Sequence, residues 1–211
     1  SQDNESAGAR YTQLQMNAQA AISAMELYEA FGETEYLSRG VSFARILMAC
    51  QASAVDPSFS IPLRGYFYEN ETHERIQTYY HRSYEHAPIK AFAMLYRLAP
   101  EHEDAARWKN SLELYREYVA LTSRTVPYGL LPNGIYELDN TDFSTITHEG
   151  ARAAGAPSLE EYNAQVRNGI RLNDRFYLRV FPVAYQFRGF HATLMGRALA
   201  AMELARALND R

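Results

Sequence analysis

Apolar residues recur at intervals of three and four along five long stretches of this chain, a pattern typical of amphipathic α-helices. The fourth stretch is the clearest, because Trp108, Leu112, Tyr115 and Val119 lie on one stripe. Stripes of this kind must be buried against other elements, so we expect an all-α fold of packed helical hairpins with Trp108 and Tyr115 in the core. The predicted helices cover residues 9–31, 35–51, 84–98, 103–122 and 190–208.

The first two predicted helices are joined by a short turn. Gly32 is expected to end the first helix, and Thr34 is the predicted N-cap of the second. Because so short a turn leaves no room for a crossover, we expect the two helices to be antiparallel. The third and fourth helices form a second hairpin around Pro100.

The last predicted helix has no successor with which to form a hairpin. Its alanines, Ala198, Ala201 and Ala205, predict close packing against a neighbouring helix. We therefore expect either that the chain is part of a longer protein or that another chain covers this flank, with self-association through the helix as one form of such contact.

The connections between the helices are long and rich in aromatic residues. We expect residues 56–80 to be a loop and residues 126–147 to form a small β-hairpin around Pro132-Asn133-Gly134. A capping box at Ser158 predicts a short helix that Gly169 ends, and Pro182 is expected to limit the extended stretch 175–181 to a sheet edge or a loop.

Length and composition fit a single helical domain over residues 1–211. The chain is 47% hydrophobic, but no apolar run approaches the roughly 20 residues that cross a bilayer. With a net charge of −4 and no basic patch, nucleic acid is excluded as an expected partner. The lone Cys50 cannot form an internal disulfide and is expected to be a buried thiol.

Two helix starts carry the same mixture of aromatic, arginine and histidine residues. Tyr80-His81-Arg82 precedes the third helix, and Arg188-Gly189-Phe190-His191 opens the last. Helix N-termini offer free N–H donors, so these junctions favour a polyhydroxylated ligand stacked on some of the 16 tyrosines. The alternative is that His86 and His191 are polar caps that satisfy loop carbonyls.

The residues alone do not identify a reaction. Glu85 is a candidate acid or base, although a glutamate in the first turn of a helix is explained equally by capping. The glutamates of one loop are interpreted as solvated charges; they are Glu69, Glu71 and Glu74. No metal is expected, because His81 and His86 lack a ligand spacing, and no cofactor fingerprint occurs.

Three segments of the chain together resemble six-hairpin glycosidases; they are residues 20–30, 80–108 and 188–191. Within that group, they resemble in particular bacterial proteins similar to glycoside hydrolase family nine (cellulase-like). The resemblance implies a partial (α/α)6 barrel that acts on oligo- or polysaccharide, with a periplasmic or secreted location. It also implies sugar contacts for the candidate residues, which are Tyr80, His81, Arg82, His86, Tyr128, Arg188, Phe190 and His191.

The family's Asp-Ala-Gly-Asp motif and late glutamate have no counterpart here. The resemblance therefore implies a chain that supplies sugar-binding loops without the full catalytic pair and is inactive alone. Two alternatives stay open. One is a polysaccharide lyase on the same toroid, with Tyr80 and His81 as base and acid. The other is a helical scaffold that binds proteins, which the long tyrosine-rich loops disfavour.

Overall fold

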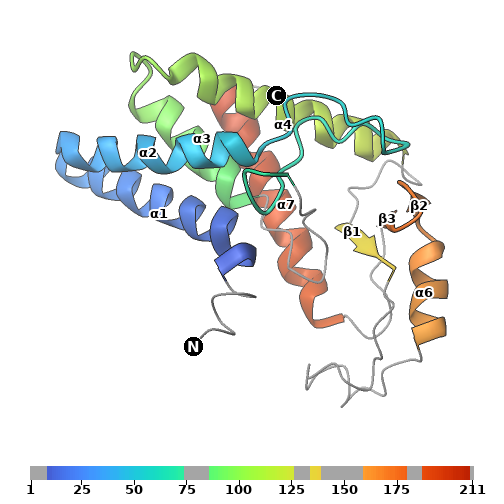
Figure 1. Ribbon diagram of the computed structural model, residues 1–211. Coiled ribbons are helices and arrows are strands. Elements are labelled where there is room, and N and C mark those ends of the chain that lie inside the picture. The colour runs from blue at the N-terminus through green and yellow to red at the C-terminus, as the bar shows by residue number, and fades with distance from the viewer. Residues whose placement is uncertain (1–8, 74–85, 126–133, 139–158, 180–186, 210–211) are drawn as a thin grey trace.

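The computed structural model describes residues 9–73, 86–125, 134–138, 159–179 and 187–209. Within them the chain is mostly helical, with a small three-stranded antiparallel sheet (Figure 1). The helices are α1 (Ala9–Phe31), α2 (Thr34–Cys50), α3 (His86–Leu98), α4 (Ala105–Thr125), α6 (Leu159–Arg167) and α7 (Phe187–Leu208). The strands are β1 (Gly134–Glu137), β2 (Ile170–Arg171) and β3 (Phe176–Arg179). All five predicted long helices are confirmed to within a few residues, and α6 confirms the short one.

The turn between α1 and α2 confirms that Gly32 ends the first helix, but it does not confirm Thr34 as the N-cap of the second. Gly32 has a φ of 72°, and its N–H donates to the carbonyl oxygen of Tyr28 over 2.8 Å, which ends α1. The N-cap of α2 is Glu33, in extended conformation and without a side-chain capping bond. Thr34 is already helical, so the N-cap prediction was wrong by one residue.

Helices α1, α3 and α7 form one layer in which α3 packs between the other two (Figure 1). Lys90 pairs with Glu26, and Arg97, further along α3, pairs with Glu29, further along α1. Contacts therefore advance in the same direction on both helices, which makes α1 and α3 parallel.

The contacts of α3 with α7 advance in the same way. His86, the first residue of α3, lies against Gly196, while Arg97 lines a groove with Arg206 and Ala207 of α7. The three helices of this layer are thus parallel to one another.

Helices α2 and α4 pack behind this layer as the second arms of the two hairpins. Gly40 of α2 faces Met25 of α1, so closely that a Cβ on Gly40 would lie 2.6 Å from the Met25 sulfur. Each residue is a similar distance along its helix from the turn, which confirms the antiparallel arrangement. Trp108 and Tyr115 of α4 are buried as predicted.

Helix α7 buries a different stripe from the predicted one. Gly196, Ala200 and Leu204 are buried, whereas Ala198 is exposed and Ala205 only half-buried. Because α7 is apolar on more than one side, periodicity alone could not choose the buried face. Contact with the start of α3 selects the face with Gly196, whose lack of a side chain allows a close approach.

The sheet has the strand order β1-β3-β2 and differs from the prediction in two respects. Strand β1 contains the expected residues Ile135 and Tyr136, but it pairs with the distant β3, and residues 126–133 and 139–147 lie outside the described structure. Strand β3 was predicted to be an edge strand or loop and is instead the central strand. Pro182 falls beyond its last residue, so it removes no hydrogen bond from the ladder.

Candidate functional site

Half of the residues predicted to contact sugar are not among those that the structure describes. Those outside the described residues are Tyr80, His81, Arg82 and Tyr128, together with the acid–base candidate Glu85. The lyase alternative depends on Tyr80 and His81 and is therefore not addressed either. Three more, Arg188, Phe190 and His191, lie in the first turns of α7, where the helix is described but their side chains are not.

His86 is the predicted site residue whose side chain is described. It is half-buried at the start of α3, and its ring packs against α7 at Gly196. A Cβ at Gly196 would lie 2.6 Å from Nδ1 of His86, so the close contact requires glycine. His86 therefore joins two helices, and a role in ligand binding stays a prediction.

The starts of α3 and α7 lie toward the same end of the layer, because the two helices are parallel. They are staggered, however. Helix α7 begins at Phe187, nine residues before Gly196, so its first turn extends roughly 14 Å beyond the start of α3 at 1.5 Å per residue.

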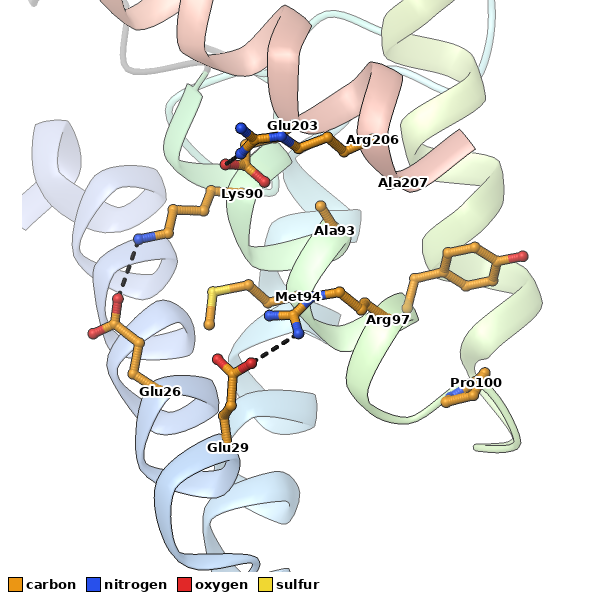
Figure 2. Close-up of a pocket in the computed structure, with 11 residues that line it drawn as sticks. Glu26, Glu29, Lys90, Ala93, Met94, Arg97, Pro100, Glu203, Arg206 and Ala207 are labelled. Carbon is orange, nitrogen blue, oxygen red and sulfur yellow. Dashed lines mark hydrogen bonds and ion pairs between the residues drawn. The ribbon is translucent and has the colours of Figure 1, made fainter. Parts of the chain in front are cut away.

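A groove of about 560 Å³ lies toward the other end of the layer, where α1, α3 and α7 meet (Figure 2). Its floor includes the buried residues Ala93 and Met94 of α3. Half-exposed Tyr96 and exposed Pro100 also line it. The other lining residues are Glu26 and Glu29 of α1, Lys90 and Arg97 of α3, and Glu203, Arg206 and Ala207 of α7.

Three ion pairs dominate the walls of this groove, and two of them join different helices. They are Lys90 Nζ with Glu26 Oε1 at 3.1 Å, Arg97 Nη1 with Glu29 Oε1 at 2.8 Å, and Arg206 Nη1 with Glu203 Oε1 at 3.5 Å (dashed lines in Figure 2). All six side chains keep substantial contact with solvent. The groove is thus lined by equal numbers of anionic and cationic groups that a ligand in solution can reach.

Arg97 of α3 interacts with acidic side chains of both neighbouring helices, Glu29 of α1 and Glu203 of α7. Its hydrogen bond to Glu29 lowers the pKa of the Glu29 carboxyl, and the same bond raises the pKa of the guanidinium, with a further contribution from the charge of Glu203. Glu29 is consequently ionised at neutral pH and accepts hydrogen bonds. A carboxyl in this state does not act as a general acid.

The sequence did not indicate this groove. On each helix the charged residues resemble the ordinary solvent-facing charges of an amphipathic helix, and only packing brings the three helices together. Glu26 and Glu29 do share one side of α1 through their spacing of three, as Lys90 and Arg97 share one side of α3 through their spacing of seven. This spacing places the charges on one side of each helix, but it does not identify the neighbouring helix that this side contacts.

The carboxylate of Glu69 is buried, although the sequence predicted a solvated charge. The side chain of Glu69 is buried, with only 2% exposed, and the neighbouring Asn70 is buried as well. The loop folds inward because Gln51, at its start, pairs with Phe67 and donates Nε2 hydrogen bonds to the carbonyl oxygens of Gly65 and Ser111. The interpretation of Glu69 as a solvated charge was therefore wrong.

Cys50 is fully buried, as predicted. Burial, with a smaller contribution from the charge of Glu71, raises the pKa of its thiol to about 12. The thiolate form, which is the nucleophile, is thus scarcely populated at neutral pH.

The described residues contain no group of three or more histidine, cysteine or acidic side chains that could hold a metal ion. No helix among them is long and apolar enough to span a membrane. Comparisons with family models, with curated proteins and with solved structures found no match.

Proposed function

We propose that this chain is a sugar-binding helical domain of a carbohydrate-active enzyme that resembles glycoside hydrolases. Its hairpins would form part of an (α/α) toroid. The parallel arrangement of α1, α3 and α7 in one layer, with α2 and α4 behind them, supports this proposal, because successive hairpins of a toroid also contribute alternately to two layers.

The observation that carries the proposal is the groove between α1, α3 and α7. Sugar hydroxyls both donate and accept hydrogen bonds, and the groove offers acceptors on Glu26 and Glu29 beside donors on Lys90 and Arg97. Tyr96 adds an aromatic ring at the rim and Met94 an apolar floor, which suit the C–H faces of a sugar ring. An oligosaccharide is therefore the proposed ligand.

Binding without hydrolysis is the proposed activity of the groove. Glycosidic cleavage generally needs two carboxyl groups, of which one has a raised pKa and donates a proton. Glu29 has a lowered pKa, and the other two glutamates of the groove are each paired with a cation. A catalytic pair would have to come from elsewhere in the protein.

Isothermal titration calorimetry with cello-, xylo- and manno-oligosaccharides tests this proposal. We expect at least one series to bind, and Arg97→Ala to weaken its binding about tenfold or more, equivalent to ~1.4 kcal/mol. Arg64→Ala is the matched control, because Arg64 forms an equally exposed pair with Glu117 at 2.9 Å outside the groove. Failure of every series to bind, or equal losses in both variants, would contradict the proposal.

A second candidate function is a helical protein-interaction scaffold that self-associates through α7. The observation that favours it is the exposure of two large apolar side chains on α7, Leu199 at 46% and Met202 at 50%. Light scattering over a range of protein concentrations tests it, since self-association raises the apparent mass with concentration.

A further inference from the structure

The outward side of α1 carries a strip of residues without any charge. Met16 and Phe31 are the most exposed of them, at 63% and 65%, and Leu27 is exposed at 40%. The solvent side of a helix in a globular protein usually carries charged residues, so an uncharged strip four turns long is unusual. This α1 strip consists of Met16, Gln19, Ala20, Ser23, Leu27, Ala30 and Phe31.

Helix α7 carries a second uncharged strip. Leu199 and Met202 are its large members, and Ala198 and Ala205 lie beside them. Arg206 follows at the carboxyl end and pairs with Glu203. These four uncharged residues are the α7 strip.

The two strips lie at opposite edges of the parallel layer, because α3 separates α1 from α7. On α1 the side toward α3 carries Glu26 and Glu29, and on α7 it carries Gly196 and Ala207. With 3.6 residues per turn, the centre of the α7 strip points about a third of a turn or more away from Gly196 and Ala207. The centre of the α1 strip points about a fifth of a turn away from Glu26 and about two fifths of a turn away from Glu29. Each chain therefore exposes one apolar edge on either side of the same layer.

We propose that the α7 strip of one copy packs against the α1 strip of a second copy and so continues the parallel layer from chain to chain. This inference rests on the proposed self-association through α7 and names its partner surface. The small side chains of Ala198 and Ala205 allow the large Leu27 and Phe31 of the next copy to approach closely.

Charge complementarity supports a second copy of this chain as the partner that packs against the α1 strip. Exposed Glu33 follows the carboxyl end of α1, and exposed Arg206 lies at the carboxyl end of α7. When parallel helices pack side by side, their carboxyl ends come together, so these opposite charges attract. A contact between two different surfaces does not close into a symmetric dimer and continues into larger assemblies unless it forms a ring.

The test uses two variants that each block one edge, Leu27→Glu and Met202→Glu, measured by size-exclusion chromatography with light scattering. We expect the unsubstituted chain to form species larger than dimers and each variant alone to be monomeric. An equimolar mixture should form a dimer and nothing larger, because one variant supplies an intact α7 strip and the other an intact α1 strip.

Other outcomes distinguish the proposed self-association through α7 from the inference that α7 packs against α1 of a second copy. If the unsubstituted chain stays monomeric at high concentration, both the self-association and this inference are wrong. If Leu27→Glu still dimerises while Met202→Glu does not, α7 pairs with α7, and only the head-to-tail inference is overturned. Dimers of Met202→Glu alone would overturn both proposals. Circular dichroism checks folding, and Ser23→Glu with Ala198→Glu provides a second pair at exposed positions.

Discussion

Two glycines with left-handed backbone conformations show how differently the same residue type is used. Gly65 has a φ of 87°, and a Cβ there would lie 1.9 Å from the carbonyl oxygen of Leu114. Gly32 has a φ of 72°, but a Cβ there would meet nothing within 4 Å. Gly32 is therefore needed only for its backbone angle, whereas Gly65 is also needed because the buried loop passes directly over α4.

Alanine substitutions separate these two requirements. We expect Gly32→Ala to lower the free energy of unfolding by about 1 kcal/mol through backbone strain alone. Gly65→Ala should cost about 3 kcal/mol or more, because backbone crowding is added to the strain. Urea denaturation measures both values, and similar losses for the two variants would contradict the close approach at Gly65.

Asp104 joins α2 to the start of α4. Its side chain is only 6% exposed and accepts hydrogen bonds from Arg45 Nε at 3.0 Å and Arg107 Nη1 at 2.9 Å. Burial acts to raise the pKa of Asp104, but the hydrogen bonds and charges of Arg107 and Arg45 outweigh it and hold the pKa below its ordinary value of 3.8. A pKa that is lower in the folded state means that ionised Asp104 stabilises the fold.

This stabilisation should be present above about pH 4 and be lost as the pH falls through the folded pKa. We expect Asp104→Asn to lower the free energy of unfolding by about 1–2 kcal/mol at pH 7, and we expect the difference from the unsubstituted chain to shrink below pH 4. Denaturant midpoints at a series of pH values measure this. Glu103→Gln is the control, because Glu103 is 79% exposed and should have little effect.

At the scale of elements, the position of β3 determines how the second half of the chain is organised. Leu178 of β3 pairs with Ile135 of β1 on one side and Ile170 of β2 on the other. The hairpin of β2 and β3 is also held to the loop before α3, because the Ser60 N–H donates to the Leu172 carbonyl oxygen over 2.7 Å. Phe59 and Phe176 make an aromatic contact beside that bond, with ring centroids 6.3 Å apart.

The central position of β3 predicts unequal effects of truncation within one sheet. Leu178 is buried, so Leu178→Ala should cost about 2–4 kcal/mol. Ile170 lies on the edge strand and is only half-buried, so Ile170→Ala should cost about 1 kcal/mol. Chemical denaturation provides both values. Equal losses would indicate that β3 is not the central strand in solution.

At the scale of the whole molecule, one hydrophobic core joins the helical layer to the sheet. It extends from Leu14 of α1 through Trp108 of α4 to Leu178 of β3 and Leu204 of α7. A stack of independent hairpins would have separate cores and lose cooperativity, whereas a continuous core favours unfolding in one step. A single domain over residues 1–211, as expected from the sequence, also predicts unfolding in one step.

Trp108 is the only tryptophan of the chain and is fully buried, so it reports on this core. We expect its fluorescence to shift to the red at the same denaturant concentration at which the helical circular dichroism signal is lost. Coincident transitions are a test of two-state unfolding. Separate midpoints would show that the hairpins unfold independently.

The helices were predictable because their signal is local. Spacings of three and four place Trp108 and Tyr115 on one side of a helix whatever lies beyond it, and Gly32 ends a helix through its own backbone freedom. For the same reason the sequence determined the short turn between α1 and α2 and hence the antiparallel hairpin.

Only the tertiary structure decided which surfaces meet. The partner of β1, the buried face of α7 and the burial of Glu69 depend on residues far away in the sequence, and local patterns leave those choices open. The groove is the clearest case, because Glu29, Arg97 and Glu203 come from three helices that are distant in the chain. Their charges are plain in the sequence, but their proximity results from the parallel packing of α1, α3 and α7.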